Sequence, residues 1–249
     1  MTNIRFYQSL IVIFLGFVSC STTLSPVEEE EASIKTISWL DSKFGFINNA
    51  EFNKYEARIM DRMEASLRGA RLWSSQRDRA NTYSWELYLL NIDQPNAFSL
   101  GHGVIVTTRG LVVHLESEAQ LAYVISHEMA HQILGHTSEA LYESNEENVS
   151  PSFHFSLDKE LDADELGLEI MRQAKYDPRH ALAAFSMAYS ADSFNSAKED
   201  PEVVTKWLDA RAANLKQLVS RIAPDSLGLE NTRDFNKLRI ELGKSLERK

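Results

Sequence analysis

The stretch SEAQLAYVISHEMAHQILG, residues 117–135, has the features of one buried helix. Ser117, with Gln120 three positions later, fits a capping box, and Gly135 fits a helix end. Apolar residues fall on almost every side of the predicted helix; they are Leu121, Ala122, Val124, Ile125, Met129, Ala130, Ile133 and Leu134. Because a surface helix keeps one polar face, this distribution predicts a helix enclosed in the protein core.

Three polar residues interrupt this apolar helix in the pattern H-E-x-x-H, namely His127, Glu128 and His131. Positions i and i+4 share one helical face, so both imidazoles can bind one ion at Zn–N distances of about 2.0–2.1 Å. Glu128 lies about 100° around the helix, beside a metal-bound water. Unpaired polar groups are costly inside a core. The pattern therefore predicts a site for one Zn²⁺ per chain, with Glu128 as its catalytic base.

A catalytic zinc needs a third protein ligand, and the sequence offers several carboxylates. Glu160 and Asp164 are i and i+4 on a helix predicted over about 157–174, so one can bind the metal while the other supports a ligand histidine. A solvated acidic face is the alternative interpretation of this pair. The competing carboxylates lie in a predicted loop and are Glu143, Glu146 and Glu147. We expect His136 to be a hydrogen-bonding residue at the helix end.

These motifs resemble the gluzincin family of HtpX-type heat-shock peptidases and CAAX prenyl endopeptidases, which includes periplasmic lipoproteins. The resemblance covers about residues 85–190 and includes Asn96-Ala97-Phe98, Gly103-Val104-Ile105-Val106 and Lys175-Tyr176-Asp177-Pro178. It implies that Glu160 is the third ligand and that Asp164 supports the site from behind the ligands. It also implies that the strand containing Val104 and Ile105 is an edge that pairs with extended substrate, although core packing explains that strand equally well.

The sequence departs from the family pattern near its C-terminal end. The family often has Thr-His-Pro followed by an arginine, whereas Lys198-Glu199-Asp200-Pro201 stands here. Arg211 can still match that arginine, at longer spacing, and would then hold the oxyanion or the substrate. His102 and His154 are expected to be ordinary surface histidines.

The N-terminal segment predicts export from the cytoplasm. A positive residue, Arg5, precedes an apolar run from Leu10 to Val18 that is short for a membrane span, as in a signal peptide. The segment 17–20 resembles a bacterial lipobox with Cys20 as the lipidated residue; an uncleaved anchor is the alternative. We therefore expect a signal peptide over 1–20, a flexible tether over 21–33, and a metallopeptidase domain over 34–249 on the periplasmic side of the envelope, in an outer-membrane lipoprotein.

The remaining pattern predicts the fold class and the regions without regular structure. We expect an α+β domain, mainly helical and zincin-like, with a small sheet from strands near 85–92 and 104–108. Helices are expected between 34 and 71, over 180–189 and over 202–222. The polar segments 74–82 and 138–153 are predicted as loops.

These expectations combine into one function and two alternatives. The chain is expected to be a zinc metalloendopeptidase that hydrolyses peptide bonds in misfolded or misassembled envelope proteins. A formal net charge of -10 argues against nucleic acid as a partner, and the membrane is expected to be a partner through the lipid anchor. The alternatives are a non-catalytic, chaperone-like protein with zinc and a latent peptidase whose acidic loop 138–153 covers the metal.

Overall fold

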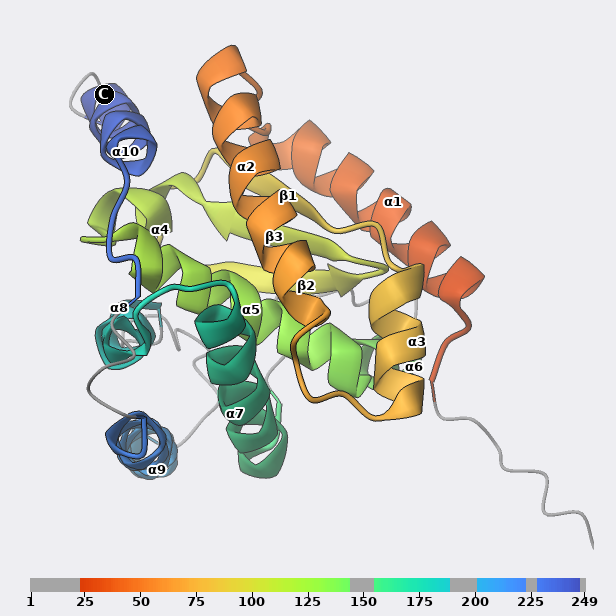
Figure 1. Ribbon diagram of the computed structural model, residues 1–249. Coiled ribbons are helices and arrows are strands. Elements are labelled where there is room, and N and C mark those ends of the chain that lie inside the picture. Colours follow the sequence, from red (N-terminus) through yellow and green to blue (C-terminus); the bar gives the residue numbers. More distant parts are fainter. Residues whose placement is uncertain (1–22, 144–154, 189–200, 223–227, 247–249) are drawn as a thin grey trace, which may run out of the picture.

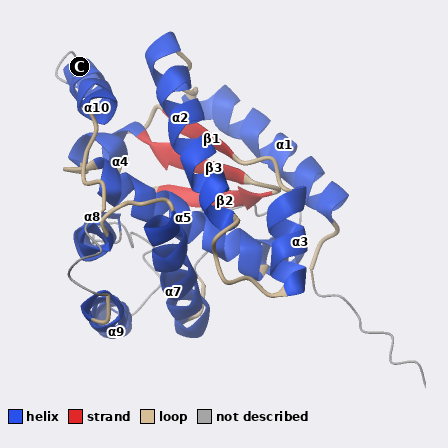
Figure 2. Cartoon of the chain, viewed as in Figure 1, coloured by secondary structure: helices blue, strands red, loops and turns tan. Residues whose placement is uncertain are grey.

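The computed structural model describes residues 23–143, 155–188, 201–222 and 228–246. Helices surround one small sheet (Figure 2). In chain order the elements are α1 (Pro26–Phe44), α2 (Ala50–Leu67), α3 (Ser74–Thr82), β1 (Glu86–Leu90), β2 (Ala97–Gly101), β3 (Val104–Thr108), α4 (Arg109–His114), α5 (Glu118–Leu134), α6 (His136–Glu143), α7 (Leu157–Gln173), η1 (Pro178–His180), α8 (Ala181–Ala188), α9 (Pro201–Ser220) and α10 (Arg233–Leu246). The structure is thus the mainly helical α+β domain that the sequence predicts.

The sheet has the order β1-β3-β2, so β3 is its central strand. β3 pairs in parallel with β1 and antiparallel with β2. The expectation that the strand of Val104 and Ile105 is a free edge is therefore wrong, because both sides of its backbone are occupied. The two edges are β1 and β2, and the latter was not predicted at all.

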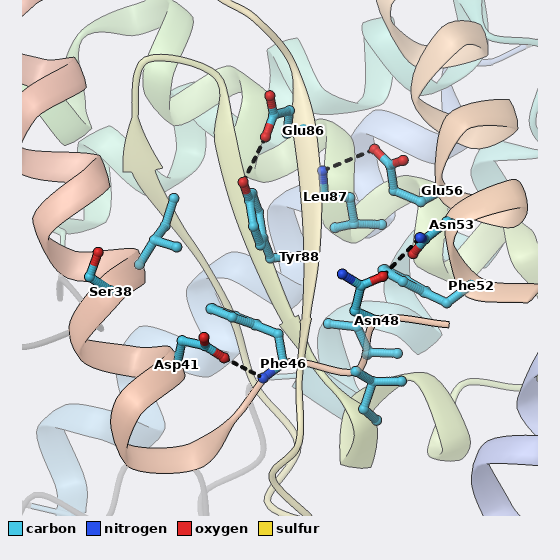
Figure 3. A pocket seen from close by; sticks show the side chains of 13 residues that line it. Ser38, Asp41, Phe46, Asn48, Phe52, Asn53, Glu56, Glu86, Leu87 and Tyr88 are labelled. Carbon is cyan, nitrogen blue, oxygen red and sulfur yellow. Dashed lines mark hydrogen bonds between the residues drawn. The ribbon is translucent and has the colours of Figure 1, made fainter. Parts of the chain in front are cut away.

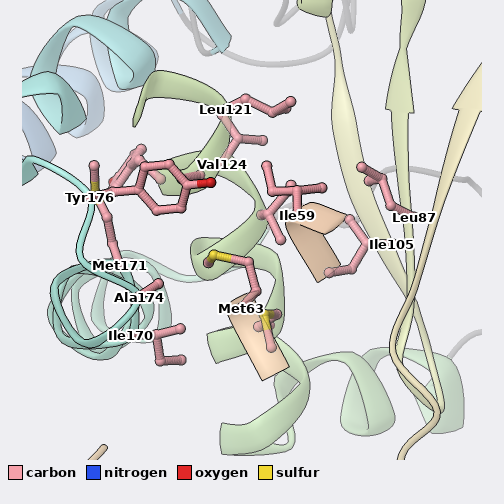
Figure 4. Close-up of a cluster of buried hydrophobic side chains, with 14 of the residues drawn as sticks. Ile59, Met63, Leu87, Ile105, Leu121, Val124, Ile170, Met171, Ala174 and Tyr176 are labelled. Atoms are coloured by element: carbon pink, nitrogen blue, oxygen red, sulfur yellow. The ribbon is translucent and has the colours of Figure 1, made fainter. Parts of the chain in front are cut away.

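Helices cover both faces of the sheet (Figure 1). On one face, Leu40 of α1 packs against apolar residues of all three strands, including Leu90, Phe98 and Val106. The other face belongs to the main core, where the sheet meets α2, α5 and α7 (Figure 4). The residues labelled there are Ile59, Met63, Leu87, Ile105, Leu121, Val124, Ile170, Met171, Ala174 and Tyr176. The sheet therefore lies between α1 and the group of helices that contains α5.

Helix α5 begins and ends as its sequence predicts. The Ser117 side chain accepts a hydrogen bond from the backbone N–H of Gln120, and Gly135 ends the helix in the left-handed region at φ 89°. Only Leu134 of its seventeen residues is not buried. The Gln120 side chain accepts from the N–H of Glu116 and not from that of Ser117, so only half of the capping box forms.

Helices α5 and α7 are packed very closely at one glycine. A Cβ atom added to Gly167 would lie 3.1 Å from both the Cα and the N of His127. Glycine therefore lets the backbone of α7 touch the backbone of α5 next to the first histidine of the motif. This contact fixes where the side chains of the two helices can meet.

Several segments differ from the sequence-based expectations. Residues 26–33 form the first turns of α1 with Glu29 and Ser33 buried, so the tether predicted over 21–33 is wrong for this part. Residues 74–82 form α3, which packs on α5, and the first part of the predicted loop 138–153 belongs to α6. Packing on α5 stabilises α3, whose polar sequence has no apolar face. The start of α1 instead has a local signal, the capping box of Ser25 and Glu28.

Within the described residues, no helix combines the length and the hydrophobicity that crossing a membrane requires. The predicted signal peptide and Cys20 lie outside the residues that the structure describes.

Candidate metal centre and catalytic site

Helices α5 and α7 bring three candidate metal ligands together. His127 and His131 come from α5 and Glu160 from the first turn of α7, and all three are buried. The two imidazole Nε2 atoms lie 3.0 Å apart. The Oε2 atom of Glu160 lies 3.3 Å from Nε2 of His127 and 3.6 Å from Nε2 of His131. Three potential ligand atoms thus form a small, nearly equilateral triangle.

The size of this triangle fits a zinc ion. In a tetrahedral complex the distance between two ligand atoms is about 1.63 times the bond length, so bonds of about 2.0–2.1 Å give about 3.3 Å. The three measured separations of 3.0, 3.3 and 3.6 Å lie around that value. Moreover, two neutral imidazoles facing each other need a shared partner, since the lone pair of one nitrogen cannot satisfy the lone pair of another.

The charge of the site also fits a divalent cation. Three buried carboxylates lie here, Glu128, Glu160 and Asp164, and one buried guanidinium, Arg211, faces two of them. Three carboxylates and one guanidinium carry a formal charge of about −2, of which a proton on His127 balances one unit in the metal-free protein. A Zn²⁺ ion would neutralise this charge, whereas burial without a further cation is unfavourable.

Asp164 holds His127 from the side away from the ligand triangle. Its Oδ1 lies 3.1 Å from Nδ1 of His127, and the same oxygen accepts a hydrogen bond of 2.7 Å from the Tyr123 hydroxyl. A carboxylate on Nδ1 fixes the imidazole so that Nε2 points at the metal position. The arrangement matches the supporting role that the family resemblance implies for Asp164.

Arg211 lies in a different environment from the one expected. Its side chain is fully buried, and its guanidinium lies 2.6 Å from both Glu160 Oε2 and Asp164 Oδ1. The rings of Phe185 and Trp207 lie 4.8 and 4.9 Å from it. This geometry makes Arg211 a partner of the two carboxylates of α7 and places its Nη2 3.4 Å from His127 Nε2, at the border of the ligand triangle.

Glu128 lies between the ligand triangle and strand β2. The Ser99 hydroxyl of β2 hydrogen-bonds the Glu128 side chain, and Ser99 also lies 2.9 Å from the Thr137 hydroxyl. Burial raises the pKa of Glu128, and Glu160 adds to the shift. A carboxylate with a raised pKa holds a proton more readily, which suits a general base that must accept one from water.

The environment shifts the pKa values of the two histidines of the motif in opposite directions. For His127, burial lowers the pKa, but the hydrogen bonds to Asp164 and Glu160 outweigh it and raise the pKa to about 9. For His131, burial dominates and lowers the pKa to about 4. In the metal-free protein the carboxylates of α7 therefore already attract a positive charge to the ligand triangle.

His136 and Phe155 contact His131 from the far side. The Nδ1 atoms of His131 and His136 lie 3.1 Å apart, so the expected hydrogen-bonding role places His136 next to a ligand histidine. Phe155 stacks on the His131 ring at 4.1 Å between centroids. Together they leave His131 little freedom to rotate.

Three contacting residues have no counterpart in the sequence-based interpretation. Tyr123 precedes His127 by one helical turn, so its i, i+4 spacing could have indicated that it contacts the site. Ser99 and Phe155 lie far away along the chain, and their positions depend on β2 pairing with β3 and on the approach of the segment before α7.

The other sequence candidates lie elsewhere. His102 is in the turn between β2 and β3, where its ring contacts Tyr83 and its Nε2 lies 3.9 Å from Glu30. Glu143 is an exposed residue at the end of α6. The candidates Glu146, Glu147, His154 and Asp200 fall outside the described residues.

Comparison with known proteins finds similarity in the region around this site. Residues 68–157 match the model of Peptidase family M48, a match that includes both histidines and ends before Glu160. The chain is 33% identical over 122 residues to the mitochondrial metalloendopeptidase OMA1 of Arabidopsis thaliana, and 29% identical over 130 residues to OMA1 of Schizosaccharomyces pombe. It is 23% identical over 189 residues to the beta-barrel assembly-enhancing protease of Yersinia pestis.

These alignments cover parts of each protein. They include 41%, 43% and 63% of this chain, in the same order, and 25%, 39% and 39% of the relatives' own lengths. The HtpX-type or CAAX subtype is not distinguished by them. The residues around the H-E-x-x-H helix are thus similar to Peptidase family M48.

Proposed function

We propose that this protein is a zinc-dependent metalloendopeptidase. The observation that supports this most strongly is the buried triangle of His127, His131 and Glu160 with Glu128 beside it. The M48 match and the names of the relatives, which are metalloendopeptidases and a protease, support the same chemistry. A zinc ion held there would acidify a bound water and polarise the carbonyl that is attacked.

Side chains of the protein carry out the proton transfers and hold the ligands in position. Glu128 accepts a proton from the water and later passes it to the leaving amine, while Ser99 holds its carboxylate in position. Asp164 and His136 keep the two imidazoles oriented. Arg211 keeps Glu160 charged, and accordingly the pKa of Glu160 lies well below its usual value although burial opposes this.

The substrate backbone is proposed to pair with the outer edge of β2, which pairs with no further strand within the described residues. This strand is an edge of the sheet, and its Ser99 touches the catalytic base. Edge strands bind extended peptides by adding a strand, which favours unfolded chains over folded ones. The strand proposed to pair with substrate is therefore β2, and no longer the strand that contains Val104 and Ile105.

Misfolded or misassembled envelope proteins are the proposed substrates. The support is a relative whose name refers to beta-barrel assembly and the export signal predicted over 1–20. We propose that Cys20 is lipidated and anchors the domain on the periplasmic side of the outer membrane. Incorporation of labelled palmitate by the parent and not by a Cys20→Ser variant tests this anchor, and equal labelling of both would contradict it.

Two measurements on the full chain test the activity. Zinc content should be near one per chain in the parent and near zero in His131→Ala. Cleavage of unfolded casein should fall at least about 1,000-fold in Glu128→Gln, while zinc content stays near one. Zinc binding without any cleavage by the parent would favour the chaperone-like or the latent alternative, and cleavage that appears on removal of the loop 138–153 would select the latent one. Equal cleavage by the parent and Glu128→Gln would contradict the proposed role of Glu128.

A further inference from the structure

A second concave site lies at the other edge of the sheet. It follows the free side of β1 and has a volume of about 700 Å³ (Figure 3). Helix α1 forms one wall, α2 forms the other, and the segment 46–48 closes one end. We call this site the β1 groove; it is lined by thirteen residues from these four parts of the chain.

The β1 groove has an apolar floor and an acidic rim. Phe52, Leu87 and Leu89 are buried lining residues. The charged lining residues are Asp41 on α1, Glu56 on α2 and Glu86 on β1, and none of the thirteen is Lys, Arg or His. Burial raises the pKa of Glu56, and the negative charge of Glu86 adds to the shift. A positive charge in the groove would relieve this repulsion.

The backbone of β1 is only partly paired on its groove side. Phe46 forms an isolated antiparallel bridge with Leu90, and the Ile47 N–H donates to the Leu89 carbonyl at 2.8 Å. Farther along, the Leu87 N–H donates to a carboxylate oxygen of Glu56 at 3.4 Å. A long side-chain contact thus occupies the position that the carbonyl of an added strand would take.

We propose that the β1 groove binds an extended peptide segment that carries a basic side chain. The peptide backbone pairs with β1 next to Leu87 and displaces the long Glu56 contact. The freed Glu56, with Asp41 and Glu86, then binds the Lys or Arg side chain, while neighbouring apolar side chains rest on the floor. Main-chain pairing with side-chain selection at alternate positions is a common mode of peptide recognition.

The groove is separate from the metal centre. The metal helix α5 contacts β2, and Glu128 reaches Ser99 on that strand, whereas the groove borders β1 across the width of the sheet. A peptide in the groove therefore leaves the β2 edge free. The proposal does not depend on hydrolysis, and it remains testable if the chain proves inactive.

Binding is measured with the full chain carrying Glu128→Gln, so that no peptide is consumed. The probes are two fluorescent seven-residue peptides of alternating Val and Thr, one with a central Arg and one with a central Glu. We expect the Arg peptide to bind at least about tenfold more tightly, with an advantage that shrinks as salt is raised. Equal affinity of the two peptides, or binding of neither, would overturn the proposal.

Charge removal in the groove provides the matched comparison. Glu56→Gln combined with Glu86→Gln should weaken binding of the Arg peptide at least about tenfold. Glu64→Gln combined with Glu241→Gln removes the same charge from exposed positions outside the groove and should change affinity less than about twofold. Thermal unfolding of each variant verifies that it is folded. Equal losses in the two double variants would show attraction by net charge alone and would refute the groove.

Amide hydrogen exchange locates the bound peptide. The amides of residues 86–89 should exchange more slowly with the Arg peptide present, and those of residues 97–101 should not change. Slowing confined to 97–101 would place the peptide at the β2 edge and would contradict binding at β1. Failure of zinc binding or casein cleavage would leave this outcome unchanged, so the two proposals can fail separately.

Discussion

Helix α5 carries buried charge at two places, and the two clusters are built differently. At its N-terminal end Glu118 is fully buried and accepts hydrogen bonds from Arg58, Tyr176 and Thr232. Nine residues later begins the metal-site cluster, where Arg211 contacts the carboxylates of Glu160 and Asp164 and a third buried carboxylate, Glu128, lies nearby. In the first cluster the buried Glu118 has one cation and two hydroxyls as partners, and the second carboxylate near Arg58, Asp234, is half exposed to water. In the second cluster the buried carboxylates outnumber the buried guanidinium.

The difference separates a structural ion pair from a candidate metal site. Arg58 is 30% exposed, so water stabilises it if its partner is lost, and the cluster joins α2, α5 and the segment before α10. Arg211 is 0% exposed and cannot reach water. A buried cluster whose charges balance within the protein holds elements together, and one whose charges do not balance requires an ion.

Removal of Arg211 should give the largest effect on stability. In Arg211→Met, Glu160 and Asp164 lose their cation, and we expect unfolding of the zinc-free protein to cost about 3–5 kcal/mol less. Zinc should restore part of this loss, because the proposed site uses Glu160 as a ligand. Urea unfolding with and without a chelator measures both values. Arg58→Met is the control, with a smaller loss that zinc does not change; equal behaviour of the two variants would contradict the distinction.

Glu118→Gln should lower stability less and leave the metal centre intact. We expect a loss of about 2–3 kcal/mol, since a hydrogen-bonded charge is replaced while Arg58 can turn to solvent. Zinc content should remain near one per chain. Glu160→Gln is the matched change of the other buried glutamate and should lose zinc. Zinc loss in Glu118→Gln would show that the two clusters are coupled.

His136→Ala should weaken zinc binding by about 10–100-fold, since supporting contacts to a ligand histidine typically contribute that much. Competition with a chelator of known affinity measures the change. His114→Ala removes a histidine at the end of α4, where it contacts the Gly110 carbonyl, and should leave zinc affinity unchanged. An unchanged affinity in His136→Ala would mean that Phe155 and the helix alone hold His131.

Two tyrosines at the Glu118 cluster should give the smallest effects. The Tyr176 hydroxyl donates to Glu118 at 2.6 Å, so Tyr176→Phe should cost about 1 kcal/mol. The Tyr55 hydroxyl is buried and makes no hydrogen bond within the described residues, so Tyr55→Phe should be neutral or stabilising. Denaturant midpoints of the two variants measure both losses of stability. A larger loss in Tyr55→Phe than in Tyr176→Phe would contradict the expectation.

Local patterns in the sequence predict the centre of the site well. The caps of α5 and the spacing of His127, His131, Glu160 and Asp164 depend on helix geometry within a few turns. That α7 approaches α5 with Glu160 facing the histidines follows only from the family resemblance, since helical spacing alone cannot orient one helix against another.

Long-range pairing explains most of what the sequence did not predict. Strand β2 is a short run, Ala97–Gly101, whose strand conformation depends on pairing with β3. Without β2, the central strand was mistaken for an edge. Arg211 likewise hydrogen-bonds to Asp164, which lies 47 positions away in the chain. No local pattern indicates which carboxylate a distant arginine will meet.

The glycine contact between α5 and α7 has a mechanical consequence. Because the backbone of α7 at Gly167 already touches His127, thermal motion can separate the two helices but cannot bring them closer. Steric contact therefore limits the distance between the two helices from below but not from above. This lower limit also restricts how closely Glu160 can approach the two histidines. A bound ion with short metal–ligand bonds would hold the two helices at that minimum distance.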